Sequence, residues 1–449
     1  MRANRGVRAE TTDYLAEPLG PATVARKLVL RPGEDRLLWA AYAKAHYFDI
    51  PGLHPDGSPR PNAAVRGAGK VGDFFGDVLS AALGAEEDGR DRPPPADLIA
   101  FGSAPDCMAH RYLRGVPSVS AALRRLWTLT PQGLTLHTEV APPAVRVEPA
   151  GSLLTRFGGG LVKLGREIAD IVTDNRMTFG ANVEDEPIAL PTLEPLVEIP
   201  RSQIAGFSVA QRKSAAVLRL LLVDGSGVDF LVAMTDREEC EYALALANGE
   251  PPLRAGARVE WVAKLATKAL TRAADLVRPN EQVVLAATTN VGYVGVQLGR
   301  ELRVPHAPVR PVPDLNVTKL RWPLPAASSQ EPNGWLDDPT MAFWAQADRS
   351  DRDAVAMADM LAHTRGTARV IVTRDRVALI AATALLREPP DPTAPLTPVL
   401  ELPPSRVRGV VAELAGRSLP PKPLLRIDFA DGSTLRLRDP IAARHAVPS

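Results

Sequence analysis

Few residues of this 449-residue chain have a type and spacing that could carry catalysis. The seven histidines form no HxxH, HExxH or HxxxH set, and Cys107 and Cys240 are too far apart for a CxxC pair. No GxSxG segment is present, and Ser226 and Ser433 each follow an Asp-Gly pair, which is typical of a hairpin turn. These residues predict no metal site and no catalytic serine.

Two glycine-rich segments and one pair of acids match functional motifs only in part. Residues 67–70, Gly-Ala-Gly-Lys, lack both the first glycine and the Ser or Thr of a phosphate loop. The glycines of residues 292–299 do not have the dinucleotide-binding spacing. Asp337 and Asp338 could serve as acid and base, but an Asp that precedes proline more often forms a turn. We therefore predict no cofactor and no catalytic residue.

Basic residues are the strongest candidates for binding a ligand. They are Arg201, Arg212 and Lys213 in the first part of the chain and Arg374, Arg376, Arg406 and Arg408 in the second. Guanidinium groups suit phosphate, so a surface of such residues could bind anionic lipid headgroups or acidic peptides. However, 53 Lys and Arg face 52 Asp and Glu, a net charge of +1, which favours a solvated surface neutralised by acids.

Aromatic residues gather in one segment of the chain. They are Trp322, Trp335, Phe343 and Trp344. Such residues either anchor a segment to a core or form an interface with a partner. Exposed aromatics that alternate with the basic residues are not evident, so we predict no nucleic-acid binding.

The elements that must position these residues form an internal repeat. Four pairs of segments recur in the same order, namely residues 30–41 with 277–288, 127–134 with 370–377, 197–206 with 400–409, and 218–226 with 425–433. Each copy is predicted to be a series of short strands joined by tight turns, and the fourth pair shares an Asp-Gly-Ser hairpin. In the second pair, Pro131 and Gly133 stand against Arg374 and Arg376. One copy could therefore keep a ligand surface that the other lacks.

The order of these elements resembles that of bacterial PH-like and GRAM-like domains. The resemblance rests on an Arg-Pro-x-Glu turn, a hairpin with Thr before its turn, an Ile-Pro-x-Ser-x-Ile-x-Gly element and the late Asp-Gly-Ser hairpin. It implies an α+β, mainly β fold, with two antiparallel sandwich or barrel modules. In this family a C-terminal helix covers the barrel, and residues 235–247 predict such a helix in the first copy.

The repeat sets the expected domain boundaries. We expect a disordered tail at residues 1–23, a first module at 24–250, a helical linker at 251–274 and a second module at 275–449. Helical inserts are predicted at 64–86 and 151–175 in the first module, and a Pro- and Trp-rich insert at 305–345 in the second. Residues 354–363 predict one more helix. Proline, 43 of 449 residues, is about twice as frequent as usual and favours loops and strand edges.

Duplicated modules of this kind usually bind rather than catalyse, so the resemblance implies a non-enzymatic adaptor or scaffold with protein partners. One alternative is peripheral binding to anionic lipids through Arg374, Arg376, Arg406 and Arg408. The least favoured alternative is an enzyme with a site between the modules. Partner identity and oligomeric state stay open.

The location of the protein is also a prediction. The first residues contain no apolar segment of a secretory signal, and no window is long and apolar enough to span a membrane. With two unpaired cysteines, these features predict a cytoplasmic protein, associated with a membrane under the lipid alternative. Arginine far exceeds lysine among the basic residues, which is typical of a high-GC bacterium such as an actinobacterium.

Overall fold

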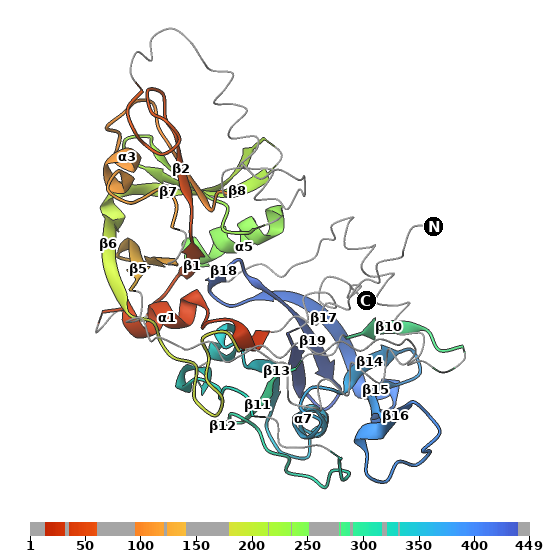
Figure 1. Ribbon diagram of the computed structural model, residues 1–449. Helices are drawn as coiled ribbons and strands as arrows, with labels where there is room; N and C mark the ends of the chain where they lie inside the picture. The colour runs from red at the N-terminus through yellow and green to blue at the C-terminus, as the bar shows by residue number, and fades with distance from the viewer. Residues whose placement is uncertain are drawn as a thin grey trace, which may run out of the picture.

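The computed structural model describes residues 14–31, 36–60, 95–120, 124–140, 179–213, 215–234, 236–250, 278, 280–287, 291–316, 321–330 and 333–438. Within them the chain is mainly β, as predicted, and none of its four sheets closes into a barrel. Figure 1 shows two lobes, which contain the first and the second half of the chain. The predicted helices at 64–86 and 151–175 and the linker at 251–274 lie outside the described residues.

The first half, residues 14–250, contains two sheets. Their strands are β1 (Trp39–Ala43), β2 (His46–Asp49), β3 (Leu98–Phe101), β4 (Arg125–Thr130), β5 (Gly133–Glu139), β6 (Leu193–Pro200), β7 (Ile204–Arg212), β8 (Ala215–Leu222) and β9 (Gly227–Phe230). One sheet has the order β1-β4-β5-β6 and the other has the order β2-β3-β9-β8-β7. The helices are η1 (Tyr14–Ala16), α1 (Pro21–Leu28), α3 (Met108–Leu113), η2 (Arg201–Gln203) and α5 (Arg237–Ala247).

The second half, residues 278–438, repeats this arrangement. Its strands are β10 (Val283–Ala286), β11 (Tyr293–Leu298), β12 (Glu301–Arg303), β13 (Met341–Ala347), β14 (Arg369–Thr373), β15 (Val377–Ala382), β16 (Leu396–Leu402), β17 (Val407–Ala415), β18 (Ser418–Leu419), β19 (Lys422–Phe429) and β20 (Thr434–Leu437). Its helices are η4 (Ala327–Gln330), η5 (Gly334–Asp337), α7 (Asp353–His363), η6 (Thr383–Leu385) and η7 (Pro404–Arg406). The sheets have the orders β10-β14-β15-β16 and β12-β11-β13-β20-β19-β17.

The two halves share one topology, which confirms the predicted repeat. Apart from β12 and β18, each strand of the second half occupies the sheet position of one strand in the first half, and α7 follows β13 as α3 follows β3. The predicted helices at 235–247 and 354–363 are α5 and α7. Asp236 caps α5 because its side chain accepts a hydrogen bond from the Glu239 N–H at 2.9 Å.

The expectation of purely antiparallel modules is wrong in one respect. Strand β2 pairs with β3 in parallel, and β11 pairs with β13 in the same way. A parallel pair needs a connection of a dozen residues or more, and the long segments from β2 to β3 and from β11 to β13 provide it. Sequence patterns of single strands do not reveal this pairing, because it depends on contacts between distant segments.

The repeated Asp-Gly-Ser segment joins a hairpin to a helix. Gly225, with φ of +82°, forms the β8–β9 turn, where a positive φ favours glycine. Beside it, Asp224 accepts a hydrogen bond from the Met108 N–H at 2.7 Å, and Ser226 Oγ accepts one from the Ala109 N–H at 3.0 Å. The hairpin thus satisfies the first free amides of α3.

The second half has the same junction. Asp431 accepts a hydrogen bond from the Asp353 N–H at 2.7 Å, and Ser433 Oγ accepts one from the Ala354 N–H at 3.1 Å. Each Asp side chain also accepts hydrogen bonds from its own hairpin Ser. The repeated motif is therefore a turn and a helix cap at once.

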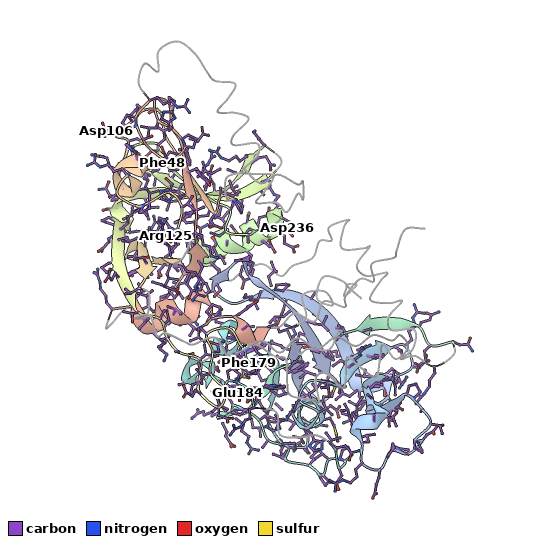
Figure 2. All side chains as sticks on the ribbon, viewed as in Figure 1. Phe48, Asp106, Arg125, Phe179, Glu184 and Asp236 are labelled. Atoms are coloured by element: carbon purple, nitrogen blue, oxygen red, sulfur yellow. The ribbon has the colours of Figure 1, made fainter. Side chains whose placement is uncertain are left out.

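Each half has its own apolar core between its two sheets. In the first half, Trp39 and Trp127 pack edge-on against Phe230, with ring centroids 5.2 and 5.5 Å apart. Figure 2 shows Phe48 and Arg125 inside this lobe, and Asp106 at its far end. The two cores explain why each half can hold its sheets together by itself.

The expected disordered tail is wrong for residues 14–23. These residues form η1 and the start of α1, and Leu15, Leu19 and Ala22 are buried. Burial of these apolar side chains favours an ordered segment, because removing apolar surface from water stabilises it. Residues 1–13 lie outside the described part of the chain.

The two halves meet along a strand pair. In Figure 1, β18 of the second half lies beside β1 of the first, and the two strands pair in parallel, Ala40 with Ser418. Asp337 accepts hydrogen bonds from the Thr23 N–H at 3.1 Å and from Ser418 Oγ. Tyr242 Oη donates a hydrogen bond to the Gly416 carbonyl at 2.9 Å. Polar side chains with defined partners therefore fix how the halves dock.

Candidate functional site

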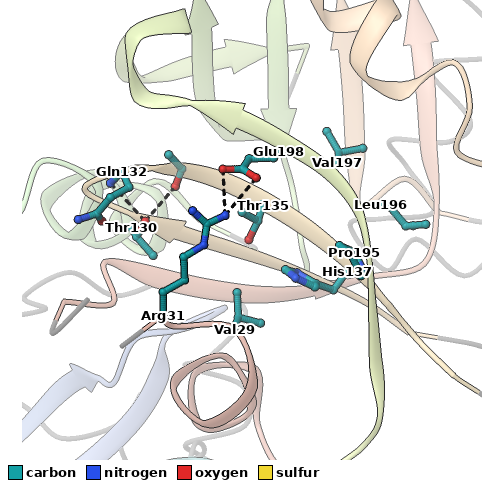
Figure 3. Close-up of a pocket in the computed structure, with 11 residues that line it drawn as sticks. Val29, Arg31, Thr130, Gln132, Thr135, His137, Pro195, Leu196, Val197 and Glu198 are labelled. Carbon is teal, nitrogen blue, oxygen red and sulfur yellow. Dashed lines mark hydrogen bonds and ion pairs between the residues drawn. The ribbon is translucent and has the colours of Figure 1, made fainter. Parts of the chain in front are cut away.

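A pocket of about 280 Å³ opens on one face of the β5 and β6 strands in the first half. It is lined by Val29, Arg31, Thr130, Gln132, Gly133, Thr135, His137, Pro195, Leu196, Val197 and Glu198. Figure 3 shows β5 and β6 forming its wall, with Val29 and Arg31 approaching from the end of α1. Alternate residues of a strand share one face, which explains why Gly133, Thr135 and His137 line the pocket together. We call it the β5–β6 pocket.

The pocket contains hydrogen-bonding atoms that lack a partner. Nη2 of Arg31 lies 3.2 Å from each carboxylate oxygen of Glu198, at the exposed mouth. Deeper in, Thr135 Oγ1 and His137 Nδ1 are buried and have no hydrogen-bond partner among the described residues. Buried polar atoms are usually paired, so two unpaired atoms in one pocket indicate that a ligand group could bind them.

His137 is neutral at pH 7. Burial lowers the pKa of its imidazole, and the negative charge of Glu198 opposes this shift only in part. A neutral imidazole can accept a hydrogen bond at one ring nitrogen. Thr135 and His137 form no hydrogen bond with each other, so they are not arranged as a nucleophile and its base.

The β4–β5 hairpin determines the shape of the pocket. Thr130 Oγ1 accepts a hydrogen bond from the Gln132 N–H at 3.3 Å, which holds the turn. The Gln132 carbonyl in turn accepts a hydrogen bond from the Arg201 N–H at 2.8 Å, which ties the hairpin tip to the end of β6. A Cβ atom at Gly133 would clash with the carbonyl oxygen of Ile199. Only glycine therefore fits at this position.

The matching place in the second half is filled by a side chain. Arg376 occupies the hairpin position of Gly133 and is buried. Its Nε lies 2.6 Å from Glu281, and its Nη1 lies 2.5 Å from Glu401, the counterpart of Glu198. Hydrogen bonds and charge from Glu281 and Glu401 raise the pKa of Arg376 against the opposing effect of burial, and Arg376 lowers the pKa of Glu281. The second half therefore closes this site with its own guanidinium.

The main chain beside the site also differs between the two halves. At the counterpart of Arg201 the second half has Pro404, which lacks an N–H and cannot make the bond that ties the first hairpin. Ala378 and Ile380 replace Thr135 and His137, and they pack with Ile371 in a small apolar cluster. The β15 positions of the second site are therefore apolar where the matching β5 positions of the first are polar.

Three of the seven basic residues predicted to bind anions are paired with acids. Arg212 pairs with Asp49 at 2.7 Å and with the buried Asp229 at 2.9 Å. Arg406 pairs with Asp353, the first residue of α7, at 2.5 Å. Together with Arg376, these residues are held by carboxylates, as the neutral composition favoured.

The other predicted basic residues do not form one surface with them. Arg201 donates a hydrogen bond to the Ile204 carbonyl at 3.0 Å, and Lys213 is an exposed turn residue with φ of +51°. Arg374 and Arg408 are exposed, and neither side chain has an ion pair with a described residue. Of the four arginines predicted to form a surface in the second half, Arg376 is buried and Arg406 is exposed but paired with Asp353, which leaves Arg374 and Arg408 as exposed arginines without an ion pair to a described residue.

The predicted interface aromatics are core residues. Trp322, Trp335, Phe343 and Trp344 are each at most 5% exposed. The rings of Trp335 and Trp344 stack 5.8 Å apart, and Trp322 packs edge-on against Tyr293. Of the two predicted roles, anchoring the 305–345 segment to the core is confirmed.

The β5–β6 pocket was not among the predicted sites, although the sequence contained a signal for it. The mismatch of Gly133 with Arg376 was visible in the repeat, but the mismatches of Thr135 with Ala378 and His137 with Ile380 lie just beyond the matched segment. Among the described residues, no three His, Cys, Asp or Glu side chains gather as a metal site, and no helix has the length and apolarity to cross a membrane.

Comparison with known proteins adds no relative. No protein-family model matches the chain, and no significant match exists among curated proteins or solved structures. The internal repeat is therefore the comparison that informs the site.

Proposed function

We propose that this chain is a non-enzymatic adaptor built from two PH-like modules, of which the first binds a protein partner and the second supports it. The β5–β6 pocket carries the proposal. It is open and lined by polar and apolar side chains in the first half, whereas Arg376, Ala378 and Ile380 fill the matching place in the second.

The strand order supports a PH-like origin. In each half, four strands form one antiparallel sheet, with the strands of the parallel pair inserted after the first of the four. Three further strands of the other sheet follow along the chain, and in the first half α5 comes after them. That order agrees with the resemblance drawn from the sequence. Each half departs from a closed barrel by its additional parallel strand pair, β2 with β3 or β11 with β13.

The chemistry of the pocket favours binding over catalysis. Its described polar side chains are an ion pair, a neutral imidazole, two hydroxyls and an amide, and none forms a hydrogen-bonded nucleophile and base. Such groups fix the orientation of a bound group and its specificity.

The edge of the sheet beside the pocket favours a polypeptide ligand. Strand β6 is the last strand of its sheet, so no described strand pairs with its outer edge. Leu190 and Leu196, both above 40% exposed, lie next to or on this strand. An extended segment could pair with the edge and place a side chain in the pocket.

A peptide-display selection tests this proposal. The purified full chain would be panned with a random peptide library, in parallel with a variant that combines Thr135→Ala and His137→Ile. These substitutions introduce the residues that the second half already has at the matching positions, so the variant should fold. We expect peptides that the wild type retains and the variant loses. If no peptide depends on the pocket, or if the chain binds only anionic vesicles and does so through Arg374 and Arg408, the adaptor proposal is wrong.

A further inference from the structure

The geometry points to a guanidinium group as the ligand of the β5–β6 pocket, supplied by an arginine side chain of an extended partner segment. This inference rests on the proposed function and names the chemistry that the same site would recognise.

The second half shows how this fold holds a guanidinium. There Arg376 reaches across the strand pair and contacts Glu401 at 2.5 Å and Glu281 at 2.6 Å. Arg278 contacts the same Glu401 oxygen at 2.6 Å. One carboxylate near the end of β16 therefore holds two guanidinium groups.

The first half keeps the carboxylate and loses one of the two guanidinium groups. Glu198 corresponds to Glu401, and Arg31, the counterpart of Arg278, pairs with it at 3.2 Å. Gly133 corresponds to Arg376 and has no side chain, and the pocket lies in the space beside it. Glu34, the sequence match of Glu281, lies outside the described residues. No side chain among the described residues of the first half takes the position of the second guanidinium, so a group from another molecule could occupy it.

The unpaired atoms of the pocket suit a group that only donates hydrogen bonds. A guanidinium has five N–H donors and no acceptor. Thr135 Oγ1, the Glu198 carboxylate and the neutral His137 imidazole can all accept hydrogen bonds. A phosphate or carboxylate ligand would instead face Glu198, with Arg31 already paired to it. The pocket therefore favours a cationic donor over an anion.

The apolar lining suits the stem of an arginine side chain. Val29, Leu196 and Val197 line the pocket beside its polar atoms. Arginine buries its methylene stem along apolar surface while its charged head meets polar groups. The lysine ammonium group is compact and has three donors, so it cannot form the planar, forked contact that the Arg376 guanidinium makes. We therefore expect arginine to bind better than lysine.

Calorimetric titration with matched peptides tests the inference. The probes are acetyl-Val-Arg-Val-amide, its citrulline analogue, which has the same shape but no charge, and its lysine analogue. We expect the arginine peptide to bind at least about tenfold tighter than the citrulline peptide, because charge-assisted hydrogen bonds to a carboxylate are lost in the latter. Equal affinities for the two peptides would overturn the inference.

Two symmetric substitutions locate the binding. Glu198→Gln should lower the affinity for the arginine peptide about tenfold. Glu401→Gln, the matching change in the second half, should leave that affinity unchanged. An equal loss in both variants would contradict the assignment to the first half. The double variant Thr135→Ala, His137→Ile is a second test. It keeps Glu198 and should still lower the affinity for the arginine peptide.

The panning and the titration together distinguish a failure of the guanidinium inference from a failure of the adaptor proposal. If the panning returns peptides that need the pocket but contain no arginine, the guanidinium inference fails and the adaptor proposal stands. If the panning returns no such peptide, the adaptor proposal fails by itself. The tripeptide titration then still decides whether a guanidinium enters the pocket.

Discussion

Gly133 and Arg376 occupy the same position of the same hairpin in two copies of one fold, but the site is open in the first copy and filled in the second. Gly133 lies beside an open pocket, whereas the Arg376 side chain fills the matching place between Glu281 and Glu401. The strands and turns of the two copies match, although one copy has a pocket where the other has an internal ion pair.

Removing the internal guanidinium should destabilise the second half. Arg376→Met removes a buried guanidinium and leaves two carboxylates without it, of which the Glu281 side chain is only 6% exposed; breaking a buried pair in this way typically costs about 3 kcal/mol. Urea unfolding at pH 7 measures the change. The exposed Arg374→Met is the matched control and should stay within about 0.5 kcal/mol of wild type.

This destabilisation should depend on pH. Because Arg376 lowers the pKa of Glu281 in the folded state, the pair stabilises the fold fully above the unfolded pKa of Glu, about 4.3. That stabilisation is lost as the pH falls through the lower folded pKa. The difference between wild type and Arg376→Met should therefore shrink below about pH 4. A difference that stays constant down to pH 2 would contradict the ion pair.

The two Asp-Gly-Ser helix caps should stabilise the protein by similar amounts. Asp224→Ala and Asp431→Ala each remove the acceptor for a helix N–H, a loss that typically costs about 1 kcal/mol. Thermal denaturation of both variants measures this. Asp375→Ala, an exposed turn residue without a cap bond, provides the control. If only one of the two cap variants is destabilised, the caps are not equivalent.

Asp337 should couple the two halves. Asp337→Ala leaves the amide of Thr23 and the hydroxyl of Ser418 without their acceptor inside the contact between the halves. We expect a loss of about 1–3 kcal/mol and a second transition in calorimetric unfolding. Tyr242→Phe removes a more peripheral bond and should have the smaller effect. One unchanged transition in Asp337→Ala would show that the contact does not depend on this residue.

His46 should make the first half sensitive to acid. Burial, and to a lesser degree the charge of Arg125, lower the pKa of His46 from 6.5 to about 4. Below pH 6.5 the unfolded chain takes up a proton that the folded chain does not, so stability falls until the pH reaches the folded pKa. The loss amounts to about 3 kcal/mol at 1.36 kcal/mol per unit. His46→Leu should remove this dependence, and the exposed His54→Leu should retain it.

The sequence allowed the repeat and its turns to be predicted because they depend on local chemistry. Asp224, Gly225 and Ser226 specify a tight turn by themselves, and so do Asp431, Gly432 and Ser433. The partners of these residues could not be predicted. That Asp224 caps a helix 116 residues away depends on how β3 and β9 pair.

The candidate site was predictable only in outline. The mismatch between Gly133 and Arg376 indicated that the copies differ in a ligand surface, but it did not indicate which copy stays open. Arg376 was predicted as a residue that binds a partner, yet it is buried because two glutamates from separate strands and turns reach it. Charge partners that are far apart in sequence decide whether an arginine is exposed.

Methyl NMR of the full chain tests the central claim most directly, because the two halves provide their own control. The spectrum of Leu and Val methyl groups would be recorded with a peptide that the wild-type chain retains in the panning. We expect shifts at Leu196 and Val197 of the β5–β6 pocket and none at the matching Val399 and Leu400. Shifts at Val399 and Leu400, or equal shifts in both halves, would contradict the central claim.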